Sequence, residues 1–328
     1  MAYFLRRIGF YLVALWVAVT MNFLLPRMMP GDPIDAILAR NQGRLPQAAI
    51  SSLRAQLGIS HAPLWQQYLT YLGNLLHGDL GVSFDYYPAT VTSVLAGGVF
   101  WTLSLLGVAL LISAGLGTLL GIAAAWSRGS FLDRLFPPVL VFIQSIPAFW
   151  VGLFLIYFIG LKLQWLPVFG AISIDTDPTN KDLAYYQDVV SHAILPAATL
   201  VLVSIGGWMV GMRNAMLNTL AEDHVVMAEA KGLPQRRIMF TYAARNAILP
   251  QVASFANALG FLIAGQFLIE YIFSYPGIGF LSIQAVFNED YPLVQGIFLF
   301  IAVAVLMANF LADIVYAILD PRVRDERR

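Results

Sequence analysis

The hydrophobic pattern of the chain is dominated by long apolar runs separated by polar segments. A helix needs ~20 predominantly apolar residues to cross the hydrocarbon core of a bilayer. The runs that reach about this length are residues 8–26, 100–126, 136–161, 195–217, 248–270 and 293–319. The pattern therefore predicts an all-α integral membrane protein with six transmembrane helices.

The first apolar run follows Arg6 and Arg7, so a cleaved secretory signal is an alternative interpretation. The apolar part of a signal peptide spans about 7–15 residues and precedes small residues. This run is longer, and residues 26–30 (PRMMP) offer no small-residue cleavage site. We therefore expect an uncleaved first span.

The distribution of basic residues predicts the orientation in the membrane. Most of the 19 lysines and arginines lie in cytoplasmic segments if the N-terminus is inside, as the positive-inside rule requires. Both termini are then cytoplasmic. The segments that follow are 1–27 (N-terminal cytoplasmic tail and first transmembrane helix), 28–99 (an extracytoplasmic insert), 100–320 (a core domain of five transmembrane helices with a cytoplasmic segment at 218–247) and 321–328 (a cytoplasmic tail).

The two external segments are longer than the connections of about 2–8 residues that usually join bundled helices. Within 28–99, apolar residues three or four apart predict short helices over 49–58 and 64–78, each ending near a glycine. The second segment, 162–194, is acidic. Such lengths favour a cap or a docking surface over simple connections.

The cytoplasmic segment 218–247 is polar and punctuated in a protein that is otherwise mostly apolar. Thr219 and Glu222 form a possible capping box that would open a short helix. Gly232 is placed to end this helix, and Pro234 to begin another. The residues between them present a small apolar surface that suits insertion into the groove of a partner. The alternative is a helix lying on lipid headgroups.

Composition supports a membrane protein and excludes several other classes. Hydrophobic residues make up 59% of the 328 residues, charged residues 12%, and the mean hydropathy is +0.72. A net charge of zero gives no indication of nucleic acid as a partner. There is no cysteine, and the four histidines are scattered, so no metal site is predicted.

Residues 228–233 (AEAKGL) and 245–250 (RNAILP) resemble the coupling loop of ABC-importer permeases, and in particular the B-type subunit of the dipeptide/oligopeptide permease family. Further segments match the pattern of that family along the chain. They are 30–33 (PGDP), 78–83 (GDLGVS), 145–149 (SIPAF), 165–170 (WLPVFG), 275–279 (YPGIG), 290–292 (DYP) and 319–322 (LDPR). Seven such segments in order make the resemblance specific.

The chain also departs from the general pattern of these permeases. The Glu-Ala-Ala of the general loop falls on residues 226–228 (VMA), so its leading glutamate is missing and Glu229 is not its equivalent. The later proline of the loop is displaced to Pro250. Gln144 stands where related chains often carry an acidic residue.

The resemblance implies the permease fold of a type I ABC importer that carries peptides by alternating access across a bacterial or archaeal inner membrane. It implies a heterodimer with a second permease, two ATP-binding cassette ATPases that use ATP and Mg²⁺, and an extracytoplasmic binding protein. None of the three lysines lies in a phosphate-binding G-x-x-x-x-G-K-[ST] loop, which fits a non-catalytic subunit without a cofactor of its own. The residues expected to couple to the ATPases are Val225, Val226, Met227, Ala228, Glu229, Ala230, Lys231, Gly232 and Arg236.

Polar residues within spans usually face a bundle interior or a cavity, so they are the candidates for a substrate path. These candidates are Gln144, Ser145, Asn214, Ser254, Asn257 and Gln266, and the helix-disrupting Pro147 beside the first two is included with them. Each could instead bond a neighbouring helix. The turn at Tyr275, Pro276, Gly277 and Gly279 suits an extracytoplasmic gate, and an aromatic belt at the interface is the alternative. Glycines at 206, 207, 211, 260 and 265 favour close packing of helices.

Two alternative functions remain open from the sequence. The same machinery in related permeases also carries oligosaccharides or metal complexes. An ATP-independent secondary transporter or channel would likewise have six spans with polar residues inside, but it would not need a cytoplasmic segment shaped for a partner.

Overall fold

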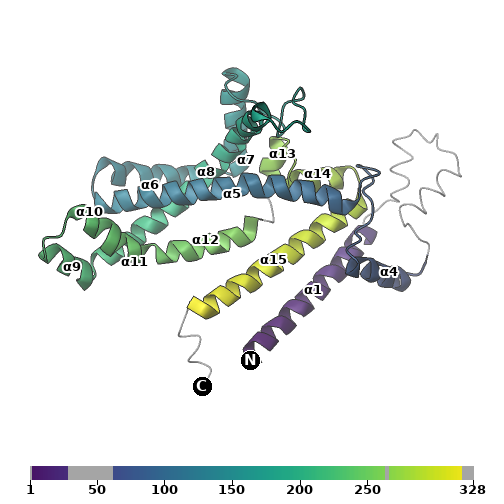
Figure 1. The fold of residues 1–328 in the computed structure, drawn as a ribbon, viewed down its shortest axis with the longest axis horizontal. Helices are drawn as coiled ribbons and strands as arrows, with labels where there is room; N and C mark the ends of the chain where they lie inside the picture. Colours follow the sequence, from purple (N-terminus) through teal and green to yellow (C-terminus); the bar gives the residue numbers. More distant parts are fainter. Residues whose placement is uncertain (1, 29–61, 263–265, 320–328) are drawn as a thin grey trace. The chain divides into compact units, whose positions relative to one another are not determined.

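A computed structural model describes residues 2–28, 62–262 and 266–319 of the chain (Figure 1). This part is helical, with one isolated β-bridge between Val82 and Thr90. The helices are α1 (Ala2–Met28), α4 (Leu64–Leu76), α5 (Val91–Trp126), α6 (Phe131–Gln144), α7 (Ala148–Leu155), η1 (Ile156–Lys162), α8 (Leu183–Leu220), α9 (Asp223–Ala230), α10 (Gln235–Arg237), η2 (Ile238–Ala244), α11 (Arg245–Ala247), α12 (Leu249–Phe261), α13 (Phe267–Ile272), α14 (Ile278–Phe287) and α15 (Tyr291–Leu319).

Four helices within the described ranges are long and apolar enough to cross a membrane: α1, α5, α8 and α15. They coincide with four of the six predicted spans, although α5 and α8 begin earlier than predicted. The stretch 136–161 forms a pair of helical segments that meet at an angle of 99°. The bend follows from Pro147, which lacks an N–H and adopts an extended backbone (ψ 130°) ahead of α7.

The predicted span over 248–270 is not one continuous helix. It is divided between α12 and α13, and Gln266 before α13 has a non-helical backbone (φ −116°, ψ 76°). Gly265 and the first predicted external helix (49–58) lie outside the described residues, as do the PGDP segment and the C-terminal tail. The second external helix is confirmed as α4.

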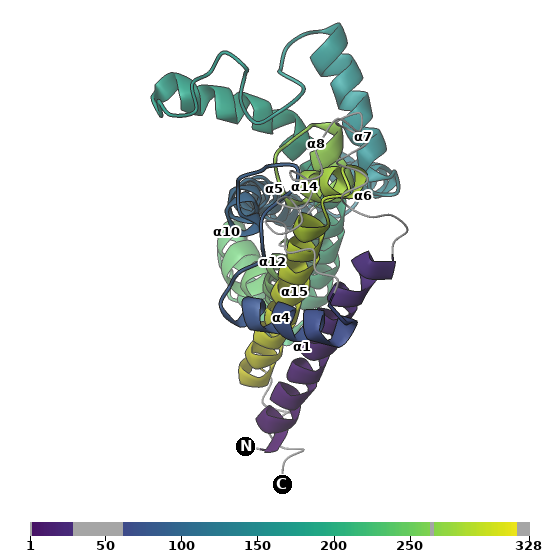
Figure 2. The same ribbon diagram turned by 90° about the vertical axis from the view of Figure 1, so that its right-hand side faces the viewer.

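The chain forms two compact units, which are described separately: residues 1–101 with 276–328, and residues 102–275. In the first unit, α1 and α15 run side by side in opposite directions, so that the start of α1 and the end of α15 lie together (Figures 1 and 2). Tyr11 stacks edge-on against Phe310, and Asn22 donates a hydrogen bond to the Gln295 carbonyl oxygen (2.8 Å). The start of α5 packs with α14 and α15 around buried Val91 and Ile278.

The second unit is built around α8. The helices α6, α7, α9, α11 and α12 all contact it, and η2 does so as well. Glycines allow the closest approaches: a Cβ at Gly206 would lie 2.8 Å from the Leu140 carbonyl oxygen, and one at Gly211 would lie 2.5 Å from the Gln251 amide. The close packing predicted for Gly206 and Gly211 is therefore confirmed.

Candidate functional site

The helix α9 and the turn after it form the centre of the 218–247 segment. Glu222 has an extended backbone at the N-cap, and Asp223 in the first turn is favourable to the helix dipole. Gly232 ends the helix in a left-handed conformation (φ +72°), and its N–H donates to the Glu229 carbonyl oxygen (2.9 Å). The predicted stop at Gly232 is thus confirmed.

The predicted capping box at Thr219 is wrong. The helix α8 continues to Leu220, so Thr219 is still helical and its hydroxyl donates to the Ala215 carbonyl oxygen (3.0 Å). The N-cap of α9 is Glu222, which makes no side-chain cap hydrogen bond. A threonine inside a helix bonds back to the preceding turn and is not available to cap the next helix.

The residues predicted to couple to a partner divide into two sets on α9. Val225 and Ala228 are 0% and 1% exposed, whereas Val226 and Met227 are 54% and 58% exposed. The buried pair belongs to one apolar cluster contributed by α5, α8, α9, η2 and α11. This cluster, the α9 anchor, consists of Ile122, Ala125, Met212, Met216, Val225, Ala228, Ile238, Ala243, Ala244 and Ala247.

His224 attaches α9 to the following helices through polar contacts that the sequence did not reveal. Its Nε2 lies 3.1 Å from the Tyr242 carbonyl oxygen and 3.0 Å from the Asn246 side-chain nitrogen. Its Nδ1 lies 3.2 Å from a Glu222 carboxylate oxygen.

The remaining predicted coupling residues are exposed around the C-terminal end of α9. They are Glu229, Ala230, Lys231, Gly232 and Arg236.

An ion pair fixes α6 to α8 in the same unit. The Arg213 Nε lies 2.5 Å from an Asp133 carboxylate oxygen, and the Gly129 N–H donates to the other oxygen of that carboxylate (2.8 Å). These residues are 80 positions apart in the sequence, and no local pattern indicated the pair. The contact fixes α8 one residue before Asn214, a candidate for the path.

The residues predicted to line a path are exposed on the second unit. Gln144 and Ser145 lie at the bend before α7, where the Ser145 hydroxyl donates to the Val141 carbonyl oxygen (2.9 Å). Asn214 is exposed on α8. Exposed polar side chains on apolar helices are costly against lipid, which favours contact with water or with another protein. The exposed candidates are Gln144, Ser145, Pro147, Asn214, Ser254, Asn257 and Gln266.

The predicted gate residues fall on both sides of the boundary between the units. In the second unit Tyr275 is buried, and its N–H donates to the Glu270 carbonyl oxygen (2.7 Å). Glu270 itself is buried and accepts a hydrogen bond from the Thr102 hydroxyl (2.8 Å), a contact that the sequence did not predict. In the first unit Pro276 is half-buried, whereas Gly277 and Gly279 are buried at the start of α14.

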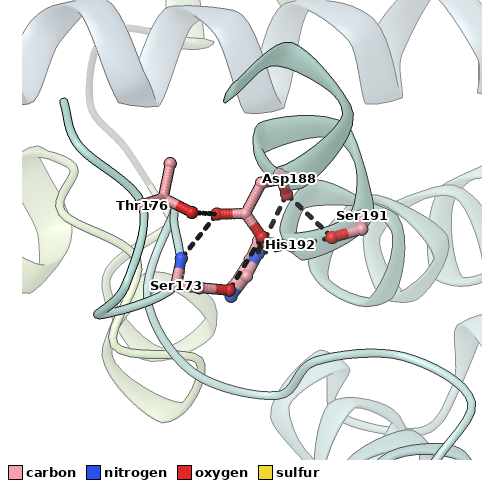
Figure 3. Close-up of polar contacts among 5 residues, drawn as sticks. All are labelled: Ser173, Thr176, Asp188, Ser191 and His192. Atoms are coloured by element: carbon pink, nitrogen blue, oxygen red, sulfur yellow. Dashed lines mark hydrogen bonds and ion pairs between the residues drawn. The ribbon is translucent and has the colours of Figure 1, made fainter. Parts of the chain in front are cut away.

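The acidic loop over 163–182 is tied to the first turns of α8 (Figure 3). The Asp188 carboxylate accepts hydrogen bonds from the Ser173 N–H (2.6 Å), the Ser173 hydroxyl (2.8 Å) and the Thr176 hydroxyl (2.8 Å), and it lies 3.2 Å from His192 Nδ1. Asp182 caps α8 by accepting from the Tyr185 N–H (2.9 Å). Hydrogen bonds from Thr179 lower the pKa of Asp177. These carboxylates thus stabilise the loop itself.

Comparison with known families now defines the class of protein. Residues 117–325 match the family model described as "binding-protein-dependent transport system inner membrane component". This range includes α9, its anchor and every candidate for the path. The chain belongs to this family, and a multi-pass membrane location is consistent with its long apolar helices.

Relatives that match the chain over nearly its full length indicate the class of transporter more narrowly than the family model does. The chain is 36% identical to the di/tripeptide transport system permease protein DppB of Pseudomonas aeruginosa, with 100% of both chains covered. It is 34% identical to the dipeptide transport system permease protein DppB of Escherichia coli (99% of both). It is 30% identical to the oligopeptide transport system permease protein AppB of Bacillus subtilis, covering 98% of this chain and 99% of that one. The chain is thus similar along its whole length to permease subunits of peptide transporters.

Proposed function

We propose that the chain is one permease subunit of an ATP-driven importer that carries peptides across the inner membrane. The observation that carries this proposal is the division of α9 into a buried pair and an exposed apolar pair. Val225 and Ala228 fix the helix in its unit, and Val226 and Met227 remain available to a partner. The peptide permeases to which the chain is similar support the substrate class.

The α9 anchor provides a route for mechanical coupling. A partner ATPase that moves Val226 and Met227 displaces α9, and the buried side chains transmit that displacement to α8 and η2. A packed core transmits strain because it has little free volume. Through η2 and α11 the movement reaches α12, so the path would open alternately to each side. ATP and Mg²⁺ are used by the partner ATPases, and this subunit needs no cofactor.

The exposed polar residues of the second unit fit a path shared with another subunit. We infer a heterodimer with a second permease, two ATP-binding cassette ATPases, and an extracytoplasmic binding protein that delivers peptides. We infer six spans with both termini in the cytoplasm, a topology that would put α9 on the side of the ATPases. The antiparallel pair of α1 and α15 supports the part of this topology that puts both termini on one side of the membrane.

Reconstitution of the transporter in proteoliposomes tests the proposal. The substitution Met227→Asp removes apolar contact with the partner without entering the α9 anchor, so we expect peptide uptake to fall while the complex remains inserted. Met227→Leu is the matched control because it keeps an apolar side chain of similar size at the same exposed position, so uptake should be retained. Unchanged uptake in Met227→Asp, or uptake by the isolated chain without ATP, would contradict the coupling role and favour a secondary transporter.

Substrate class is tested separately with the same preparation. Competition of labelled dipeptide uptake by di-, tri- and longer peptides should be strong, and competition by oligosaccharides or metal chelates weak. The reverse order would replace peptides by another cargo and leave the coupling role of α9 intact.

A further inference from the structure

The helix α4 carries an apolar surface that is exposed within the described structure. Trp65, Leu69 and Leu76 are 66%, 58% and 88% exposed, and Leu72 is half-exposed between them. These four residues, the outer apolar face, follow the spacing of one side of an α-helix. Solvation of this much apolar surface by water is unfavourable, so the face requires an occupant.

The helix has two further faces with different surroundings. Tyr68 and Tyr71 contact α1, where their rings lie 5.1 and 5.5 Å from the Phe23 ring and the Tyr68 hydroxyl lies 2.7 Å from the Thr20 hydroxyl. Gln66, Thr70 and Asn74 form a polar, exposed face. With 3.6 residues per turn, the three faces are centred roughly a third of a turn apart.

The position of α4 relative to α1 identifies what lies against each face. The candidate span in α1 covers Arg7–Leu24 and exposes large apolar side chains such as Phe10 and Trp16, which suit a surface in contact with lipid. The contacts of α4 are with residues 20–23, at the end of this span. Figures 1 and 2 show α4 crossing α1 rather than running along it. A helix that crosses a span at its end lies near the boundary between hydrocarbon and water.

We propose that α4 is an interfacial helix that lies on the membrane at the end of the α1 span, with its outer apolar face against lipid. The face of α4 that carries Tyr68 and Tyr71 then contacts α1, and the polar face contacts water. The sequence of α4 (LWQQYLTYLGNLL) suits a position at the boundary between hydrocarbon and water, because tryptophan and tyrosine favour this interface. The helix contains no charged residue, so its binding to the membrane depends on burial of apolar side chains and not on attraction to anionic headgroups. The surface is independent of which solute the transporter carries.

Labelling at single cysteines tests the proposal directly because the chain contains no cysteine of its own. A nitroxide at Leu69→Cys or Leu76→Cys is expected to be more accessible to oxygen than to a water-soluble nickel chelate in nanodiscs containing the intact transporter. Gln66→Cys and Asn74→Cys are matched controls on the polar face of the same helix, and they should show the reverse preference. Trp65→Cys provides a third position on the outer apolar face if one variant does not assemble.

Two results would overturn the proposal. Preferential access of the nickel chelate at Leu69 and Leu76 would place the face in water. Low access of both reagents would show that protein covers it, whether from another segment of this chain, a second permease or a binding protein. A matching oxygen preference in nanodiscs of neutral and of anionic lipid is expected from the absence of charge, and a strong dependence on anionic lipid would contradict this basis of binding.

Discussion

The helices α9 and α4 are both short and both expose apolar side chains, yet they are held in opposite ways. In α9, two of eight residues are buried in the α9 anchor, which draws on helices from several parts of the sequence. In α4, none of the 13 residues is buried, and the helix is held on one side by tyrosine contacts with α1. Burial fixes α9 to its unit, so a force on its exposed pair is transmitted. The weaker attachment of α4 suits a helix supported by lipid.

A charge placed in the α9 anchor should impair stability and uptake most. Val225→Asp buries a carboxylate without a partner, which costs several kcal/mol, on the order of the 3–5 kcal/mol seen for an uncompensated buried charge. We expect the 218–247 segment to become sensitive to proteolysis and uptake to be lost. The neighbouring substitution Met227→Asp should impair uptake without this sensitivity. Equal sensitivity in the two variants would show that α9 is not anchored through Val225.

A smaller effect is expected at the end of α9. Gly232 has φ +72°, and a Cβ there would meet no atom within 4 Å, so only backbone strain opposes substitution. Gly232→Val should destabilise the complex by about 1–2 kcal/mol, the penalty for a left-handed conformation. Gly232→Asn should be better tolerated because asparagine adopts this conformation more readily. Thermal unfolding and the ratio of uptake to ATP hydrolysis check the pair, and equal losses would contradict a conformational cause.

Local features of both helices could be predicted from sequence. Glycine after a short run correctly predicted the end of α9, and apolar spacing correctly predicted α4. The direction of Val225 and Ala228 could not be predicted, because adjacent apolar residues on a short helix look equivalent until their neighbours are known. The anchor that distinguishes them is completed by distant residues of α5, such as Ile122, and by residues of α8 and η2.

The same limit explains the polar contacts that were missed. Asp133 pairs with Arg213, and Thr102 with Glu270, across 80 and 168 positions. A hydropathy pattern identifies such residues as polar but does not pair them. The division of the predicted fifth span into α12 and α13 was missed because hydropathy counts apolar residues and does not register the non-helical backbone at Gln266.

The hydrogen bond between α4 and α1 should contribute only modestly to the stability of the protein. Tyr68→Phe removes the hydroxyl that lies 2.7 Å from the Thr20 hydroxyl but keeps the ring against Phe23. A typical hydrogen bond contributes ~0.5–1.5 kcal/mol, so a small fall in Tm with nearly unchanged uptake is expected. A double-mutant cycle with Thr20→Val measures the coupling. A coupling energy of zero would show that the two hydroxyls do not stabilise α4.

The smallest change in stability is expected for a substitution on the polar face of α4. Gln66→Glu adds a charge to the polar face, where a surface substitution usually changes stability by no more than about 0.5 kcal/mol. Leu69→Glu adds the same charge to the outer apolar face and should lower Tm more, because a carboxylate is unfavourable against hydrocarbon. The difference in Tm between these two variants, measured in lipid nanodiscs, reports directly on the face that meets the membrane. If the two variants behaved alike, exposure of Leu69 would reflect contact with water, and α4 would be held by α1 alone.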